Sequence, residues 1–271
     1  MTDLKELINE VEKRGYGSVS ARARVCQDII LKAISKSQFS RNVTIKGGVV
    51  MRSITGDARR ATLDMDLDFI RYSLSEDSIR KFMDRLNCLD DLTIVIDSPI
   101  AELSQQEYRG KRFYVKVTDR NGFSLRSKID LGVHKNIEQI EQEEYCFDVC
   151  LDDEGASLLI NSKEQIFAEK LRSLLRFGTL STRYKDIYDL SFISENIDNA
   201  DRMNRCLNTY ILDDTSMREK TMDDVIENIS RTFSNKNYMN KVRAAKDKNW
   251  TDNTVDEAVD QILSFLTSLK R

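Results

Sequence analysis

The chain has 271 residues, of which 40% are hydrophobic and 32% charged, enough for one large core or two modest ones beneath a well-solvated surface. Its net charge of −3 excludes a protein that is a polycation throughout, although a local basic surface for nucleic acid remains compatible with it. No run approaches the ~18 apolar residues of a membrane span, and the polar N-terminus predicts no secretory signal.

Cysteine and histidine usage narrows the chemistry further. The five cysteines are scattered and odd in number, which predicts reduced thiols in a cytoplasmic protein. A single histidine, His134, argues against a Ser-His-Asp triad and against a multi-histidine metal site. Proton transfer would then fall to carboxylates, lysines or water.

The first part of the chain predicts alternating helices and strands. Helices are expected at 3–14, 19–36, 49–54 and 75–88, and strands at 44–46 and 64–70. Between 92 and 151 the pattern has a period of two, and Asn121-Gly122 predicts a tight hairpin between strands at 111–117 and 123–131. Another strand is expected at 145–151.

From Ser162 onward only helical patterns remain. Helices are expected near 162–176, 184–195, 199–212, 217–231, 236–248 and 254–269. The chain is therefore predicted to form an α/β core with N-terminal helices over residues 1–155, followed by a helical domain over 156–271.

The most informative segment joins a glycine pair to a row of aspartates. Asp64, Asp66 and Asp68 alternate with apolar residues, so on a strand they would share one face, with Leu63, Met65, Leu67 and Phe69 on the other. Adjacent carboxylates repel unless a cation neutralises them, and oxygen ligands favour Mg²⁺ or Mn²⁺. Asp130, on a second strand, would supply a third carboxylate for a pair of metal ions.

Gly47 and Gly48 precede this strand and open a short helix. Glycines let a phosphate approach the backbone closely, and the first amides of a helix point toward such an anion. Together the glycines and carboxylates predict a site for a metal-bound nucleoside triphosphate. The simpler alternative is that the aspartates decorate a solvated strand face, although aspartate is poorly suited to strands.

A second group of charged residues lies in the helical part. Lys170 falls at the edge of an apolar helical stripe, where it would either extend out to solvent or reach the triphosphate. Arg183, Asp186 and Asp189 follow at helical spacing. They would form a structural Arg–Asp pair, or else Asp186 would act as a base or hold Lys170 in place.

Two stretches of this part are rich in cations. Six basic residues lie between Lys163 and Lys185, and six more between Arg231 and Trp250, the latter with aromatic residues among them. Such helices are usually ordinary solvated faces, but a concave basic surface here would suit an RNA backbone or a triphosphate tail.

The same motifs resemble the AbiEii/AbiGii family of nucleotidyltransferase-like toxins. The resemblance rests on four segments in the same order: Gly47-Gly48, Arg60 to Asp66, Lys128 to Asp130, and Glu164 to Leu171 with Arg183 to Leu190. It implies an α+β fold, with a polymerase-β-like nucleotidyltransferase core and mixed sheet, followed by a C-terminal helical domain that completes the active site.

The resemblance also implies a role for each matching residue. Asp64, Asp66, Lys170 and Asp186 are expected to be catalytic, with Asp64, Asp66 and Asp130 as metal ligands, Lys170 on the triphosphate and Asp186 as acid or base. The expected nucleotide-binding residues are Gly47, Gly48, Arg60, Thr62, Lys128, Lys170 and Arg183. Gly48 stands where many related transferases have serine, and Asp68 has no assigned role.

The function implied is that of the toxin in a type IV toxin–antitoxin pair, acting in abortive infection and phage defence. Such a toxin would use Mg²⁺ or Mn²⁺ to transfer a nucleotide from GTP, CTP or UTP to RNA, with the tRNA 3′ end as expected acceptor, and so block translation. The cognate antitoxin would not bind it stably. The alternatives are GTP or NTP binding without transfer, and nucleotidylation of a protein or small molecule, because one scaffold serves several acceptors.

Overall fold

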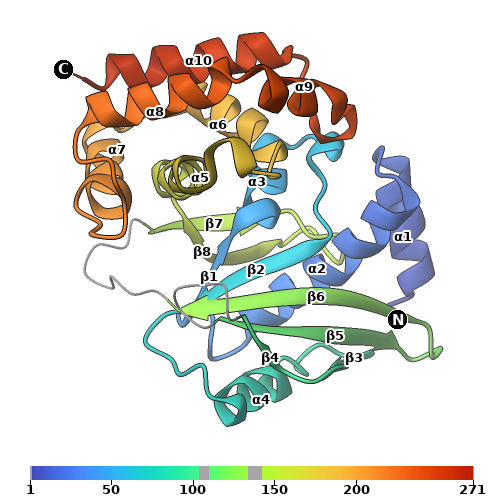
Figure 1. Ribbon diagram of the computed structural model, residues 1–271. Coiled ribbons are helices and arrows are strands. Elements are labelled where there is room, and N and C mark those ends of the chain that lie inside the picture. The colour runs from blue at the N-terminus through green and yellow to red at the C-terminus, as the bar shows by residue number, and fades with distance from the viewer. Residues whose placement is uncertain (1, 104–109, 134–141, 271) are drawn as a thin grey trace. The chain divides into compact units, whose positions relative to one another are not determined.

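The computed structural model describes residues 2–103, 110–133 and 142–270, and the chain divides into two compact units. The first unit spans Met1–Asn161 and the second Ser162–Arg271 (Figure 1). Mixed α/β structure is confined to the first unit, whereas the described part of the second is helical.

The first unit is built on one mixed sheet. Its strands are β1 (Val43–Lys46), β2 (Asp64–Phe69), β3 (Leu92–Ile96), β4 (Ala101–Glu102), β5 (Lys111–Asp119), β6 (Ser124–Val133), β7 (Gln142–Phe147) and β8 (Ala156–Asn161). The order across the sheet is β3-β5-β6-β2-β1-β8-β7, and β4 pairs with β5. Most neighbours are antiparallel, but β2 runs parallel to β6 and β1 parallel to β8.

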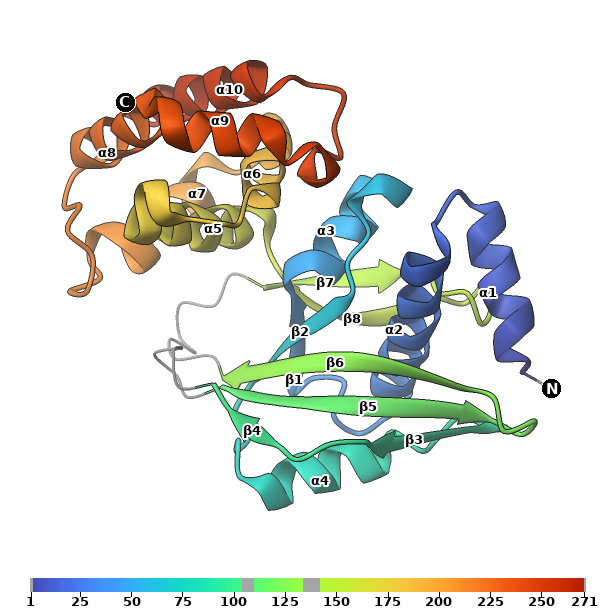
Figure 2. The same ribbon diagram turned by 45° about the vertical axis from the view of Figure 1, so that its right-hand side comes forward.

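Helices cover one face of this sheet. They are α1 (Leu4–Lys13), α2 (Ser18–Lys36), α3 (Gly47–Thr55) and α4 (Glu76–Arg85). Helix α2 packs on β6 and β8, α4 packs on β3, and α1 lies against α2 (Figure 2). The predicted apolar stripe of the second helix is confirmed: Val25, Ile29, Ile30, Ala33 and Ile34 are all fully buried.

A buried polar network ties α2 to α3. The Arg52 guanidinium bonds to the Gln27 amide oxygen at 3.1 Å and to Asp28 Oδ1 at 2.8 Å, and Arg24 contacts the second oxygen of Asp28 at 3.3 Å. Because a buried charge is costly unless it is paired, these bonds fix α3 against the core. The amide of Gln27 also donates to the Thr62 carbonyl at 3.2 Å, next to β2.

The second unit contains α5 (Lys163–Phe177), α6 (Lys185–Glu195), α7 (Ala200–Leu207), α8 (Met222–Ser234), α9 (Lys236–Ala244) and α10 (Val255–Ser268). Side chains cap several of the helix starts: Ser162 accepts from the Gln165 amide, and Thr221 and Thr254 each form a reciprocal capping box. These caps define the boundaries better than apolar periodicity does.

Several sequence-based boundaries were wrong. The helix expected at 217–231 begins only at Met222, after the Thr221 cap, and the helix expected at 199–212 ends at Leu207, where one π turn follows. The strand expected at 145–151 is β7, which begins earlier and ends at Phe147. Strand β8 was not predicted, because Leu158 and Ile160 point the same way while Leu159 is half-buried, so the alternation is weak.

No helix in the described ranges is long and apolar enough to cross a membrane.

Candidate active site

The aspartates of β2 alternate as their spacing predicts. Met65, Leu67 and Phe69 are buried in the core, and Asp64 and Asp66 extend from the opposite face of the strand. The placement of Leu63 was wrong, because it precedes the strand and its side chain is 52% exposed. Burial of the apolar row therefore fixes the register of the strand, and with it the direction in which the carboxylates point.

The glycine pair lies directly beside these carboxylates. Lys46, the last residue of β1, pairs in register with Asp66, and Gly47 then begins α3 with a φ of +65°. A Cβ atom at Gly47 would lie 2.2 Å from Asp66 Oδ2, and one at Gly48 would lie 2.5 Å from Thr62 Oγ1. Only glycine fits at either position without displacing a predicted site residue.

The start of α3 is open to an anion. Its N-cap, Lys46, makes no side-chain capping bond, unlike the N-caps of α1, α4 and α5. The first amides of a helix have no partner within the helix, so they remain available for a phosphate group. Glycine at the first two positions means that these residues place no side chains of their own over the amides.

Asp68 differs from the other two aspartates of the strand. Its carboxylate is nearly buried and pairs with the Lys46 ammonium, the Nζ and Oδ1 atoms being 2.7 Å apart. Gly132 of β6 packs against it, since a Cβ there would lie 2.3 Å from Asp68 Oδ1. Asp68 therefore holds Lys46 at the end of β1, beside the glycine pair.

Strand β6 brings two further predicted residues alongside β2. The parallel register places Lys128 opposite Asp64 and Asp130 opposite Asp66. The Lys128 ammonium contacts Asp64 Oδ2 at 2.7 Å, so the cation and the half-exposed carboxylate neutralise each other.

Asp130 is held by Arg112 of the neighbouring strand β5. The guanidinium makes two parallel bonds, Nε to Oδ1 and Nη2 to Oδ2, both of 2.7 Å. This hydrogen bonding raises the pKa of Arg112. Across the ranges 2–103, 110–133 and 142–270, no three acidic, histidine or cysteine side chains are grouped closely enough to hold a metal ion. Metal binding by Asp64 and Asp66, with Asp130 as a third ligand, therefore stays a prediction.

Arg60 and Thr62 lie between the glycine pair and β2. Arg60 ends a short 3-10 helix, Ala58–Arg60, and is only 3% exposed. The Thr62 hydroxyl contacts the Gly48 backbone region, and its carbonyl accepts from Gln27. Thr62 therefore lines the glycine pair, whereas burial of Arg60 points to a role in packing this connection.

The second unit gathers its own charged cluster. Lys170 of α5 is 8% exposed and contacts two carboxylates of α6, Asp186 Oδ1 at 2.5 Å and Asp189 Oδ2 at 2.8 Å. Arg183 binds the other oxygen of Asp186 at 2.8 Å. Asp186 therefore holds Lys170 in place, as one of the sequence-based alternatives predicted. Lys170 does not extend out to solvent, which was another of the alternatives.

Asp189 and Trp250 also belong to this cluster, although neither was among the predicted catalytic, nucleotide-binding or metal-binding residues. Asp189 is fully buried and accepts a bond of 2.9 Å from the Trp250 indole nitrogen. Its position three residues after Asp186 was visible in the sequence, whereas the contact with Trp250 spans 61 residues and has no local signal. His134 lies outside the described residues.

The architecture defines the class of protein. A mixed sheet with a glycine pair after one strand and paired aspartates on the next is the polymerase-β-like nucleotidyltransferase fold, and solved structures agree. MenT4, a nucleotidyltransferase toxin from Mycobacterium tuberculosis H37Rv, has a TM-score of 0.53 at 13% identity, covering 97% of this chain and 99% of that one. A protein described as a nucleotidyltransferase from H. pylori has a TM-score of 0.51 at 14% identity, covering 92% and 93%.

The family follows from sequence. The model of the nucleotidyl transferase AbiEii toxin family, from type IV toxin–antitoxin systems, matches residues 29–264, and the chain belongs to this family. No curated protein matches the chain in sequence. The expected family and α+β fold are both confirmed.

Proposed function

We propose that the protein transfers a nucleotide from a nucleoside triphosphate to RNA, the tRNA 3′ end being the acceptor, and thereby blocks translation as the toxin of an abortive-infection system. The observation behind this proposal is the contact between Gly47 and Asp66, which sets an uncapped helix start against a pair of carboxylates. An anion site and a cation site side by side suit a metal-bound triphosphate.

The residues present fit a divalent metal. Asp64 and Asp66 offer carboxylate oxygens on one strand face, and Mg²⁺ is commonly held by one or two carboxylates together with substrate phosphates and water. Two protein ligands are therefore enough. When bound, Mg²⁺ or Mn²⁺ would neutralise the phosphates and lower the pKa of an attacking hydroxyl.

The chain's own groups would then orient the nucleotide. The amides of Gly47 and Gly48 would bind phosphate oxygens, and Lys46, held by Asp68, would add a positive charge at the same end of β1. Lys128 would exchange its contact with Asp64 for one with the triphosphate as the carboxylate turns to the metal. Contact of Lys170 with the triphosphate, a nucleotide role for Arg183 and acid–base action of Asp186 stay predictions.

The proposal is tested by incubating purified protein with each radiolabelled NTP, Mg²⁺ and total tRNA. Label in RNA is expected with one or a few of the NTPs, with none after chelation by EDTA and recovery on addition of Mn²⁺. Asp66→Asn is expected to abolish transfer, whereas Asp84→Asn, at an exposed site on α4, is the matched control. Label in a protein or small molecule, or tight NTP binding without transfer, would contradict the RNA acceptor.

A further inference from the structure

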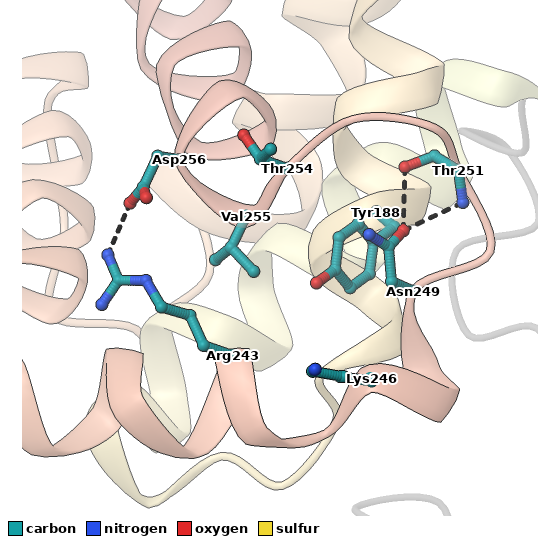
Figure 3. Close-up of a pocket in the computed structure, with 8 residues that line it drawn as sticks. All are labelled: Tyr188, Arg243, Lys246, Asn249, Thr251, Thr254, Val255 and Asp256. Atoms are coloured by element: carbon teal, nitrogen blue, oxygen red, sulfur yellow. Dashed lines mark hydrogen bonds and ion pairs between the residues drawn. The ribbon is translucent and has the colours of Figure 1, made fainter.

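The second unit contains a pocket of about 430 Å³ that is formed only by its own residues. The pocket lies between the C-terminal end of α9 and the start of α10, with α6 on its inner side (Figure 3). Three of its lining residues, Arg243, Lys246 and Asn249, belong to the basic, aromatic-rich stretch from Arg231 to Trp250. None of the residues that line it belongs to the glycine and aspartate site.

Tyr188 brings a hydroxyl group to the wall of the pocket. The side chain is 1% exposed, and its hydroxyl points into the pocket (Figure 3). It makes no hydrogen bond to any described residue and is not fully shielded from solvent, so a ligand in the pocket can reach it. Burial raises the pKa of Tyr188, so the hydroxyl keeps its proton at neutral pH and is available as a donor.

The charges around the pocket favour an anion. Arg243 is paired with Asp256, the Nη2 and Oδ1 atoms being 2.6 Å apart. Lys246 forms no ion pair with any residue in the described ranges, and Figure 3 shows its ammonium extending into the pocket. The lining therefore has an uncompensated positive charge next to the free hydroxyl.

The start of α10 adds donors at the same place. Thr254 caps the helix and is occupied by its reciprocal bonds with Glu257. The next two residues, Val255 and Asp256, line the pocket, and their amides precede the first intrahelical bond, which Ala258 donates. Amides at this position attract anions through the helix dipole.

Hydrogen bonds and a ring contact hold the loop between α9 and α10 that lines the pocket. The Asn249 side chain accepts from the Thr251 amide and hydroxyl, both at 3.0 Å, and donates to the Asn253 carbonyl at 2.9 Å. Trp250 is buried against Phe192, with ring centroids 5.5 Å apart, and bonds to Asp189. A preorganised loop lowers the entropy cost of binding a ligand.

From these contacts we infer that this pocket binds a phosphate group, with the Tyr188 hydroxyl, the Lys246 ammonium and the α10 amides as its ligands. The group would come from an RNA backbone or from a free nucleotide. The inference is independent of the nucleotidyltransferase proposal, because it depends on residues of the second unit alone.

Trp250 is the only tryptophan of the chain, so its fluorescence reports on this loop. The full-length protein is titrated with pyrophosphate, with a single NTP and with a short single-stranded RNA, all in an Asp66→Asn background that weakens metal-dependent binding elsewhere. A saturable change in fluorescence is expected. Tighter binding of RNA than of NTP identifies the backbone as the source, and the reverse identifies a nucleotide.

Two variants and one control make the assignment specific. Tyr188→Phe removes only the hydroxyl and Lys246→Ala only the free cation, and each is expected to weaken binding about tenfold or more. Lys248→Ala removes a lysine from the same short turn that does not line the pocket, and is expected to have no effect. Absence of saturable binding, or equal affinity in Tyr188→Phe, Lys246→Ala and Lys248→Ala, would overturn the inference.

Discussion

Two clusters of aspartates with basic partners occur in this protein, and they differ in exposure and pairing. On the sheet, the Asp64 carboxylate is half-exposed and pairs with the Lys128 ammonium. In the helical unit, Lys170 is nearly buried between Asp186 and the fully buried Asp189. The sequence presents the two clusters alike, as acids and bases at regular spacing.

The difference in burial gives the two clusters different physical roles. A half-exposed ion pair contributes about 0–1 kcal/mol, so its carboxylate can exchange a lysine for a metal at little cost. Removing one partner from a buried pair leaves an uncompensated charge, at a cost of about 3–5 kcal/mol. The sheet cluster is therefore suited to chemistry, and the helical cluster to holding α5, α6 and Trp250 together.

The largest effect is expected at the sheet cluster. Asp66→Asn is expected to lower nucleotide transfer by about a hundredfold or more, because it removes a metal ligand, while the melting temperature stays close to that of the wild type. Transfer assays and thermal unfolding on the same preparation measure both. Activity near the wild-type level would remove Asp66 from the site.

Lys170→Ala tests the helical cluster, where we expect a loss of stability. The free energy of unfolding is expected to fall by about 3–5 kcal/mol, since Asp189 loses its cation in a buried site. Lys128→Ala is the matched control on the sheet and is expected to cost less than about 1 kcal/mol. If Lys170→Ala leaves stability unchanged but abolishes transfer, the cluster has a direct catalytic role instead.

Gly47→Ala tests whether the sheet cluster needs the close approach of the Gly47 backbone to Asp66. The added methyl group would meet Asp66 Oδ2, and φ is +65°, so a loss of about 1–2 kcal/mol is expected together with reduced transfer. Gly56→Ala is the comparison, because φ there is also +65° but no atom lies within 4 Å of a Cβ. Equal activity in both variants would show that the close approach to Asp66 is unimportant.

Arg112→Gln tests whether Asp130 is a metal ligand. Without the two guanidinium bonds this carboxylate becomes free to turn toward Asp66, its partner in register. If Asp130 is a metal ligand, the apparent affinity for Mn²⁺ is expected to rise a few-fold, as followed by activity against Mn²⁺ concentration. An unchanged or weaker affinity would leave Asp64 and Asp66 as the protein ligands.

The smallest effect concerns thiol reactivity, which distinguishes the two units. Burial raises the pKa of Cys26 to about 12, so at pH 8 it stays protonated and unreactive in the folded first unit. Cys206 is buried in the second unit, whereas Cys88 and Cys146 are exposed. In Lys170→Ala, Cys206 is expected to label faster while Cys26 stays protected; mass spectrometry after brief alkylation separates them.

Sequence patterns predicted the elements of this protein better than its contacts. Alternation on β2 and the apolar stripe of α2 are local properties, so both could be read from spacing. The bidentate pairing of Asp130 with Arg112 depends on the register between β5 and β6, and the burial of Lys170 depends on two carboxylates of another helix. Neither has a signature within a single segment.

Strand β8 has a consequence for synthesis of the protein on the ribosome. It is the last strand in the chain, yet it lies in the sheet between β1 and β7 and completes the hydrogen bonding of β1. Until Asn161 has left the exit tunnel, a nascent chain exposes the free edge of β1, which invites pairing with other chains. Pausing or truncation before that residue would therefore favour aggregation over release of a folded first unit.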